Sequence, residues 1–164
     1  MKRHNSQRGF FAYSLYQQMK KNKDIFLLVG DLGYKIFDQH FKDFPARCIN
    51  CGASEQAMLG IAVGLALDGK IPFVYSITPF LIFRPFEWIR NYLDNENIPV
   101  KLVGSGRDFD YKIDGFTHWS HDVKQFLDCF LNIRQFWPEK KEEIPVMVRK
   151  MIRNNRASFI SLTR

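Results

Sequence analysis

The chain has 164 residues, of which 46% are hydrophobic and 25% charged, a balance typical of a folded protein rather than a disordered one. This is the length of one domain, so we expect residues 1–164 to fold as a single unit. The net charge is +7, from 24 basic and 17 acidic residues. Because the basic residues are spread along the chain instead of clustering on one face, we expect no nucleic acid among the partners.

We expect neither a secretory signal nor a membrane span. Residues 1–5 are not followed by an apolar segment of the signal-peptide kind. The most apolar run, residues 71–83, is about half as long as a bilayer requires and contains prolines. An odd cysteine count fits a reducing compartment, and Cys48 and Cys51 lack the second pair of a structural zinc site. We therefore expect a cytoplasmic protein without membrane contact and without a metal ligand set of its own.

Apolar segments of strand length alternate with segments of helical periodicity. The expected strands are residues 25–29, 47–49, 72–76, 100–103, 132–136 and 158–162. The expected helices are residues 10–21, 54–67, 79–93, 121–131 and 138–154, the last one broken at Pro145. Such alternation favours a parallel sheet covered on both faces. The sequence thus predicts an α/β protein with three α/β/α layers and a mainly parallel sheet of about six strands.

Several polar and aromatic residues follow the ends of the expected strands. Asp31 follows the first strand, Glu55 the second and Phe80 the third, while the segment 104–118 follows the fourth. The carboxyl ends of parallel strands meet at one edge of the sheet, and ligands bind there. The sequence therefore predicts that these residues share one site.

Glu55 lies in the first turn of an expected helix, within the segment Asn50–Met58. A carboxylate there can simply complement the helix dipole, a gain of about 0.3–1 kcal/mol. If it is instead buried against a ring nitrogen, it can share a proton with that nitrogen, because burial generally raises the pKa of a carboxyl group. The sequence leaves both roles open.

The other candidates also have two interpretations. Phe80 and Phe83 either pack in the core or form a wall for a flat ring, where stacking adds about 0.5–1.5 kcal/mol. His118, in a glycine-containing loop with Asp114, is either structural or a proton carrier near neutral pH. An acid, an aromatic pair and a polar cluster in this order predict a clamp for a flat heteroaromatic cofactor. The chain contains no GxGxxG, GxxxxGK[ST] or GxSxG motif, so it has no recognisable means of holding a diphosphate.

The segment 44–50, its continuation Gly52–Met58 and the run Asp114-Gly115-Phe116-Thr117-His118 resemble the pyrimidine-binding, central domain of transketolase. The resemblance covers residues 30–122 and implies a thiamine-diphosphate-binding fold and transfer of a two-carbon ketol unit between sugars. Two positions depart from the family pattern. Pro79 stands where a threonine is expected before the first phenylalanine, and Trp119 replaces a common glutamine, which leaves the preference for phosphorylated sugars open.

The resemblance implies cofactor contacts for four of the candidates. Glu55 matches the glutamate that hydrogen-bonds N1′ of the aminopyrimidine and so promotes loss of the thiazolium C2 proton. Phe80 and Phe83 match the aromatic pocket around the pyrimidine, and Asp31 matches an aspartate near the cofactor.

The resemblance also implies substrate contacts for Asp114 and His118, which match residues that bind sugar hydroxyls; His118 is the second expected catalytic residue.

Transketolase also has a diphosphate-binding domain, whose GDG…N signature holds Mg²⁺ and the phosphates. No segment here matches that signature. We therefore expect one subunit of a split enzyme, in which a companion chain provides Mg²⁺ and diphosphate binding within a homodimer or heterotetramer. The small residues of segment 53–66 suit close packing, either at a subunit contact or on the chain's own sheet. Two alternatives remain: a decarboxylase or acyl-transfer subunit with the same cofactor, and a non-catalytic module of the same fold.

Overall fold

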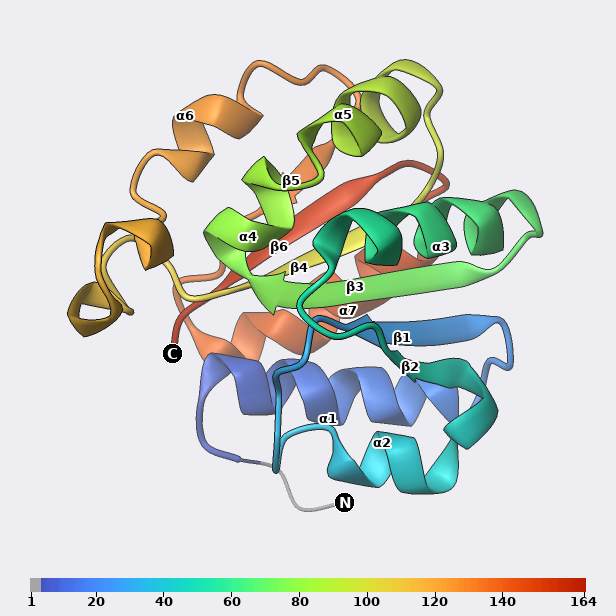
Figure 1. Cartoon of the computed structure of the whole chain (residues 1–164). Coiled ribbons are helices and arrows are strands. Elements are labelled where there is room, and N and C mark those ends of the chain that lie inside the picture. Colours follow the sequence, from blue (N-terminus) through green and yellow to red (C-terminus); the bar gives the residue numbers. More distant parts are fainter. Residues whose placement is uncertain (1–3) are drawn as a thin grey trace.

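The computed structural model describes residues 4–164, so the first three residues of the expected domain lie outside the described part. These residues contain a six-stranded sheet in the order β2-β1-β3-β4-β6-β5, with parallel neighbours throughout (Figure 1). The strands are β1 Ile25–Val29, β2 Cys48–Asn50, β3 Ile71–Ile77, β4 Lys101–Ser105, β5 Arg134–Phe136 and β6 Ser158–Leu162. The predicted parallel α/β sheet is confirmed.

The helices alternate with the strands, as the periodicity predicts. The α-helices are α1 Gln7–Met19, α2 Asp38–Asp43, α3 Glu55–Leu67, α4 Thr78–Phe83, α5 Phe86–Trp88, α6 Val123–Leu127 and α7 Ile144–Arg153. A π-helical segment spans Ile89–Asn95, and short 3-10 helices span Pro45–Arg47, Lys112–Asp114, Phe116–His118 and Lys141–Glu143. Within residues 4–164, no helix is both long enough and apolar enough to cross a bilayer.

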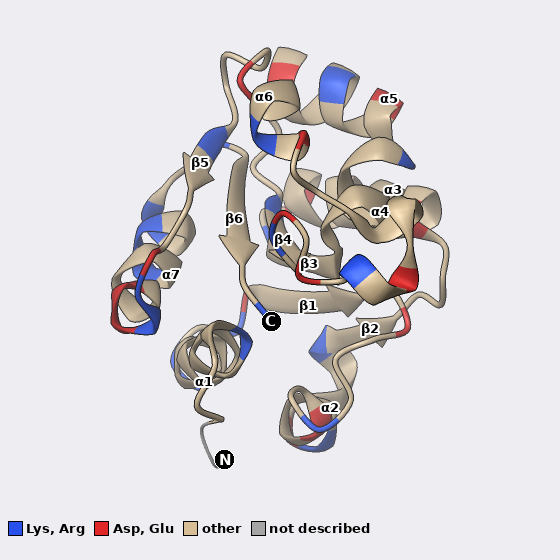
Figure 2. Cartoon of the chain, turned by 90° about the vertical axis from the view of Figure 1, so that its left-hand side faces the viewer, with Lys and Arg blue, Asp and Glu red and all other residues tan. Residues whose placement is uncertain are grey.

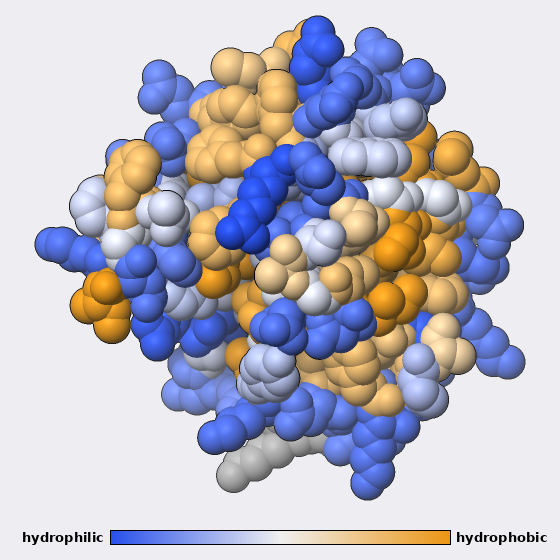
Figure 3. Space-filling view, viewed as in Figure 1, coloured by the Kyte–Doolittle hydropathy of each residue, from blue (hydrophilic) through white to orange (hydrophobic). Residues whose placement is uncertain are grey.

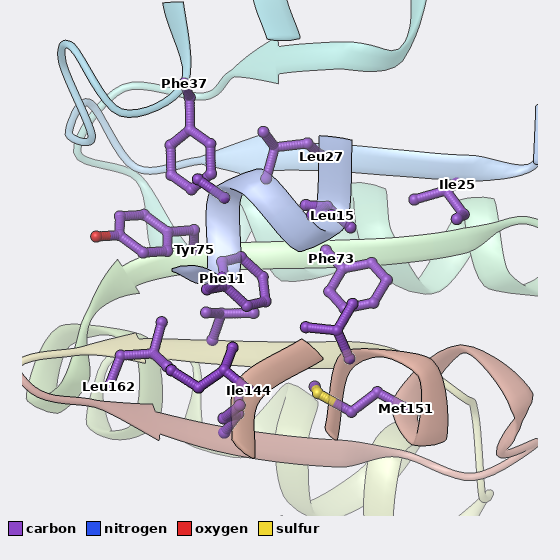
Figure 4. Packing of buried hydrophobic residues seen from close by; sticks show 14 of the residues in the cluster. Phe11, Leu15, Ile25, Leu27, Phe37, Phe73, Tyr75, Ile144, Met151 and Leu162 are labelled. Atoms are coloured by element: carbon purple, nitrogen blue, oxygen red, sulfur yellow. The ribbon is translucent and has the colours of Figure 1, made fainter. Parts of the chain in front are cut away.

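The side chains of successive strand residues pack in two separate cores, one on each face of the sheet. Leu27 packs in the core under α1 and α7, with Phe11 and Val148, and Figure 4 shows part of this cluster. The next residue, Leu28, packs in the opposite core with Met58 of α3 and the helices that follow. Because side chains alternate across a strand, continuous apolar runs are needed to supply both faces.

Two prolines behave differently from the sequence expectation. The expected helix 79–93 is divided after α4, because Pro85 has no amide hydrogen to continue the helical pattern and adopts a non-helical conformation. Pro145 was expected to break a helix, but it lies in the first turn of α7, where its missing amide hydrogen costs nothing. The expected helix 121–131 is also shorter, and α2 was not expected.

Candidate functional site

The site lies at the carboxyl edge of the sheet, which Figure 2 views from the side at which the strands end. Glu55 is the first residue of α3, shortly after β2 ends at Asn50. The segment that follows β4 extends outward beyond the strand ends (gold in Figure 1). Thr78, the first residue of α4, donates a hydrogen bond from its hydroxyl to the carbonyl of Gly106, so the chain segments after β3 and β4 are tied together.

Glu55 is buried and paired on both carboxylate oxygens. Its residue exposure is 3%. The Ser76 hydroxyl, from β3, donates to Oε1 at 2.9 Å, and Nη1 of Arg84 donates to Oε2 at 2.7 Å. A residue that only complemented the helix dipole would not need to be removed from water. The geometry therefore supports the alternative in which Glu55 serves a buried site.

Gly30, directly after β1, forms the wall behind this carboxylate. A Cβ atom added to Gly30 would lie 3.1 Å from Ser76 Oγ and 3.4 Å from Glu55 Oε1. Any side chain at this position would press on the Ser76–Glu55 hydrogen bond. The close approach of the backbone explains a glycine here, although its φ is not in the left-handed region.

Arg84 and His118 cover the ring of Phe80. The Arg84 guanidinium carbon lies 3.8 Å from the Phe80 ring centroid. The His118 ring meets the Phe80 ring edge-to-face, with centroids 4.8 Å apart. Glu55, Arg84, Phe80 and His118 therefore form one continuous row. Arg84 was not among the predicted site residues, although its position four residues after Phe80 on a helix was a usable signal.

A cavity of about 450 Å³ opens beside this row. Its lining residues are Ala53, Ser54, Glu55, Gln56 and Arg84. A buried carboxylate beside open volume of this size fits a flat ring that carries a basic nitrogen. The Phe80 ring does not line the cavity, because Arg84 lies over it. A second cavity of about 400 Å³ lies near Tyr34 and Phe37, and none of Glu55, Phe80 and His118 lines it.

Asp31 lies at the same edge but has other partners. Its carboxylate accepts hydrogen bonds from the Tyr34 hydroxyl at 2.7 Å and from Nδ2 of Asn50 at 3.2 Å. Both hydrogen bonds lower the pKa of the Asp31 carboxyl group, and the bond from Tyr34 has the larger effect. Its backbone is in the left-handed region, with φ of 55°. Asp31 is thus held, exposed, next to Gly30 and does not contact Glu55 directly.

Phe83 and Asp114 flank the row. Phe83 is 39% exposed and packs edge-to-face on Phe126, with ring centroids 5.2 Å apart, not on Phe80. Asp114 is exposed and ends a short 3-10 helix four residues before His118. Of the predicted site residues, the structure thus brings Glu55, Phe80 and His118 together and leaves the other three around them.

Further basic and hydroxyl groups lie next to His118, beyond the end of the row. They were not among the predicted site residues. The Tyr111 ring lies 6.4 Å from the His118 ring. The Tyr111 hydroxyl contacts Ser105 Oγ at 3.0 Å and accepts from Nη1 of Arg8 at 3.2 Å. The Arg164 guanidinium lies 5.1 Å from the Tyr111 ring centroid. Arg8 and Arg164 come from opposite ends of the chain, so no local pattern could have grouped them.

The described residues contain no group of three or more His, Cys, Asp or Glu side chains arranged to hold a metal ion. Cys48 and Cys51 are free thiols, and burial raises the pKa of Cys48 to about 12.

Known proteins resemble this chain in both sequence and fold. The profile of the family described as "Transketolase, pyrimidine binding domain" matches residues 6–164. A subunit of the apulose-4-phosphate transketolase of Actinobacillus succinogenes is 37% identical over 102 residues, which cover 62% of this chain and 33% of that protein. A 6-deoxy-6-sulfo-D-fructose transketolase subunit of a Clostridium species is 27% identical over 161 residues, which cover 96% of this chain and 49% of that protein.

A solved structure described as a split gene transketolase, in an inactive beta4 tetramer, superposes with a TM-score of 0.85 at 27% identity. That match covers 97% of this chain and 51% of the other. The chain thus spans between a third and about half of the length of the proteins that it matches. Since the family profile covers nearly all of its residues, the chain belongs to the family of transketolase pyrimidine-binding domains.

Proposed function

We propose that this chain is the pyrimidine-binding subunit of a thiamine-diphosphate-dependent transketolase-like enzyme that transfers a two-carbon ketol unit between sugars. Residues 1–164 act as one pyrimidine-binding unit, and residues 30–122 carry most of the site. The observation that carries the proposal is the buried Glu55 carboxylate, which lines a cavity together with Arg84, the residue that stacks on the Phe80 ring. Relatives named as transketolase subunits support the same reaction class.

In the proposed mechanism, Glu55 holds the proton that is shared with the ring nitrogen. The Ser76 hydroxyl, at 2.9 Å from Oε1, fixes the orientation of the carboxylate, and Gly30 closes the space behind it. Phe80 provides an apolar face that excludes water from one side of the ring. When bound, thiamine diphosphate supplies a nucleophilic carbon and an electron sink for the two-carbon unit. Buried donors and acceptors of this kind are effective because they are already oriented before the reaction.

The remaining candidates face the substrate or the outer part of the cofactor in this proposal. His118 and Asp114 contact sugar hydroxyls, and His118 moves a proton on the substrate. Asp31 and Phe83 are the two further residues to which we assign cofactor contacts. The arginines around Tyr111 add positive charge that suits an anionic group on the sugar.

We propose that a companion chain with the GDG…N signature holds Mg²⁺ and the diphosphate, and that the assembly is a homodimer or a heterotetramer. The outer side of α3 supports a contact there, because Ala57, Ile61 and Gly64 are exposed one turn apart and Ile61 is 42% exposed. Leu67, at the end of the same helix, is 71% exposed. Figure 3 shows apolar surface gathered over the helices of this face. The proposed enzyme is cytoplasmic, in keeping with three free cysteines in the described chain.

The test combines the purified chain with a candidate companion and measures transfer of a ketol unit from a ketose to an aldose. We expect activity that requires both chains, thiamine diphosphate and Mg²⁺. Turnover of 2-oxo acids without turnover of ketoses would favour a decarboxylase or acyl-transfer subunit. Absence of any cofactor-dependent turnover, together with absence of cofactor binding by calorimetry, would leave a non-catalytic module and contradict the proposal.

A further inference from the structure

Arg84 makes both of the contacts that the proposed function assigns to the pyrimidine ring. Its Nη1 donates to Glu55 Oε2 at 2.7 Å, and its guanidinium carbon lies 3.8 Å from the Phe80 ring centroid. A guanidinium group is flat, carries N–H donors and stacks on aromatic faces. An aminopyrimidine that shares a proton with Glu55 has the same three properties. The two groups therefore compete for one carboxylate oxygen and one ring face.

We propose that Arg84 is a placeholder for the pyrimidine ring: it occupies the ring's position in the free chain, and cofactor binding exchanges the Arg84–Glu55 ion pair for the bond between Glu55 and the ring nitrogen. This inference rests on the proposed function, since it concerns the same site.

The side chain of Arg84 is free to leave while its backbone stays in place. Arg84 follows the last residue of α4, so helical spacing brings it over Phe80, four residues earlier. Its carbonyl accepts a hydrogen bond from Nε2 of Gln56 at 3.2 Å, which anchors the main chain. Its side chain is 46% exposed, whereas that of Glu55 is 2% exposed. Rotation about the arginine side-chain bonds is therefore enough to move the guanidinium into solvent.

Because Glu55 is buried, we expect Arg84 to leave only when another donor takes its place at the carboxylate. A buried carboxylate that loses its cation without a replacement is strongly unfavourable. Arg84 thus keeps Glu55 paired in the free chain and leaves when the ring provides a new donor. The consequence is a lower apparent affinity for the ring, because only the fraction of molecules with Arg84 displaced can bind it.

The test uses the full chain and the methylated aminopyrimidine fragment of thiamine, without thiazolium or diphosphate, titrated by calorimetry. Arg84→Ala removes the competitor, so we expect it to bind the fragment about three- to tenfold more tightly than the wild type. Arg90→Ala is the matched control, because it removes one positive charge from an exposed arginine whose Nη1 contacts Asn91. We expect Arg90→Ala to bind like the wild type. Equal or weaker binding by Arg84→Ala would overturn the inference, since it would mean that Arg84 is a bystander or a direct contact of the bound ring.

A second measurement follows Arg84 in the wild-type chain and does not depend on how well the variant folds. The guanidinium N–H signal of Arg84, assigned by its loss in Arg84→Lys, should shift toward that of a solvated arginine when the fragment is added. Glu55→Gln should produce much of that shift without the fragment. A bound fragment that leaves the Arg84 signal unmoved would contradict the exchange.

These readouts separate the inference from the proposed function. Suppose that Arg84→Ala binds the fragment more tightly but the chain shows no ketol transfer with any companion. This result would support the role of Arg84 as a placeholder and contradict the proposed enzyme activity. Ketol transfer together with weaker fragment binding by Arg84→Ala would support the proposed enzyme activity and contradict the placeholder role of Arg84.

Discussion

Two buried charges at opposite edges of the sheet differ in the nature of their partners. Glu55 is at the carboxyl edge, and Lys101, the first residue of β4 and 1% exposed, is at the amino edge. Lys101 Nζ donates to the carbonyl oxygens of Asn154 at 2.7 Å and Arg156 at 2.6 Å, where the chain passes from α7 to β6. Glu55 is instead paired with side chains, one of them the half-exposed Arg84.

This difference separates a charge held by the backbone from the one to which we assign a function. Both charges border open volume, about 280 Å³ at Lys101 and about 450 Å³ at Glu55, so a cavity alone does not identify a site. Backbone carbonyls at the end of a helix cannot leave, and Lys101 holds them together. A flexible side chain can leave, and a ligand can take its place. The partner's freedom to move is therefore the informative property of a buried charge.

The largest expected effect is on activity, from Glu55→Gln. Glutamine keeps the shape and the hydrogen bond to Ser76 but cannot share a proton with a ring nitrogen. We expect kcat with the companion chain to fall by about 10²–10³-fold at saturating thiamine diphosphate. Glu87→Gln, an exposed change on α5, is the control and should leave kcat unchanged. More than a tenth of the wild-type activity in Glu55→Gln would remove Glu55 from the proposed mechanism.

Lys101→Met tests the structural role that we assign to the buried lysine. It leaves the carbonyls of Asn154 and Arg156 without their shared donor, so we expect the free energy of unfolding to fall by about 2 kcal/mol. Activity per folded molecule should not change. Lys70→Met is the control, because Lys70 forms a partly exposed ion pair with Asp24 at 3.2 Å, and such pairs contribute about 0–1 kcal/mol.

The pH dependence of stability gives a sharper test of Lys101. Burial lowers its pKa from the ordinary value of 10.5 to about 8. Between these pH values the unfolded chain binds more protons than the folded chain, so Lys101 makes the free energy of unfolding rise as the pH rises from about 8 to 10.5. The stability difference between wild type and Lys101→Met, measured with urea, should therefore increase over this range. A difference that stays constant would show that Lys101 has the same pKa in the folded and unfolded states.

A smaller effect is expected for His118→Asn. The half-buried His118 ring meets the Phe80 ring edge-to-face, and its Nδ1 lies 3.1 Å from Thr117 Oγ1. We expect kcat/KM for the sugar to fall by about 10–30-fold, with stability unchanged within about 0.5 kcal/mol. His121→Asn, which removes a ring stacked on Phe109 at 4.9 Å, is the matched control outside the row. Equal losses in the two variants would mean that His118 acts only through the local fold.

The sequence predicted the sheet because each strand supplies two cores and must be apolar along its length. It did not predict the effects of the prolines. Pro85 ends a helix and Pro145 begins one. The residue is the same, and the outcome depends on whether the lost amide hydrogen falls inside a helix or in its first turn. That position is known only when the neighbouring elements have been placed.

The sequence predicted part of the site for a similar reason. Glu55, Phe80 and His118 could be placed because each follows a strand end. Arg84 was missed because its partner Glu55 is 29 residues away, and their contact depends on how α4 leaves β3. Helix geometry also explains why Phe80 pairs with Arg84 and not with Phe83. At about 100° per residue, a residue four positions on lies about 40° from the first, and one three positions on lies about 60° away on the other side.

The smallest expected effect concerns the hydrogen bond from Ser76 to Glu55. Ser76→Ala leaves Oε1 without the donor that lies at 2.9 Å, so we expect a loss of about 1 kcal/mol in stability and a fall in kcat of about three- to tenfold. Gly30→Ala presses on the same hydroxyl, since its new Cβ would lie 3.1 Å from Ser76 Oγ. In the Ser76→Ala background that hydroxyl is absent, so Gly30→Ala should cost less there than in the wild type. Additive stability losses in this double-mutant cycle would mean that the Ser76–Glu55 pair is not the reason why position 30 requires a glycine. The carboxylate would then have more room than the structure indicates.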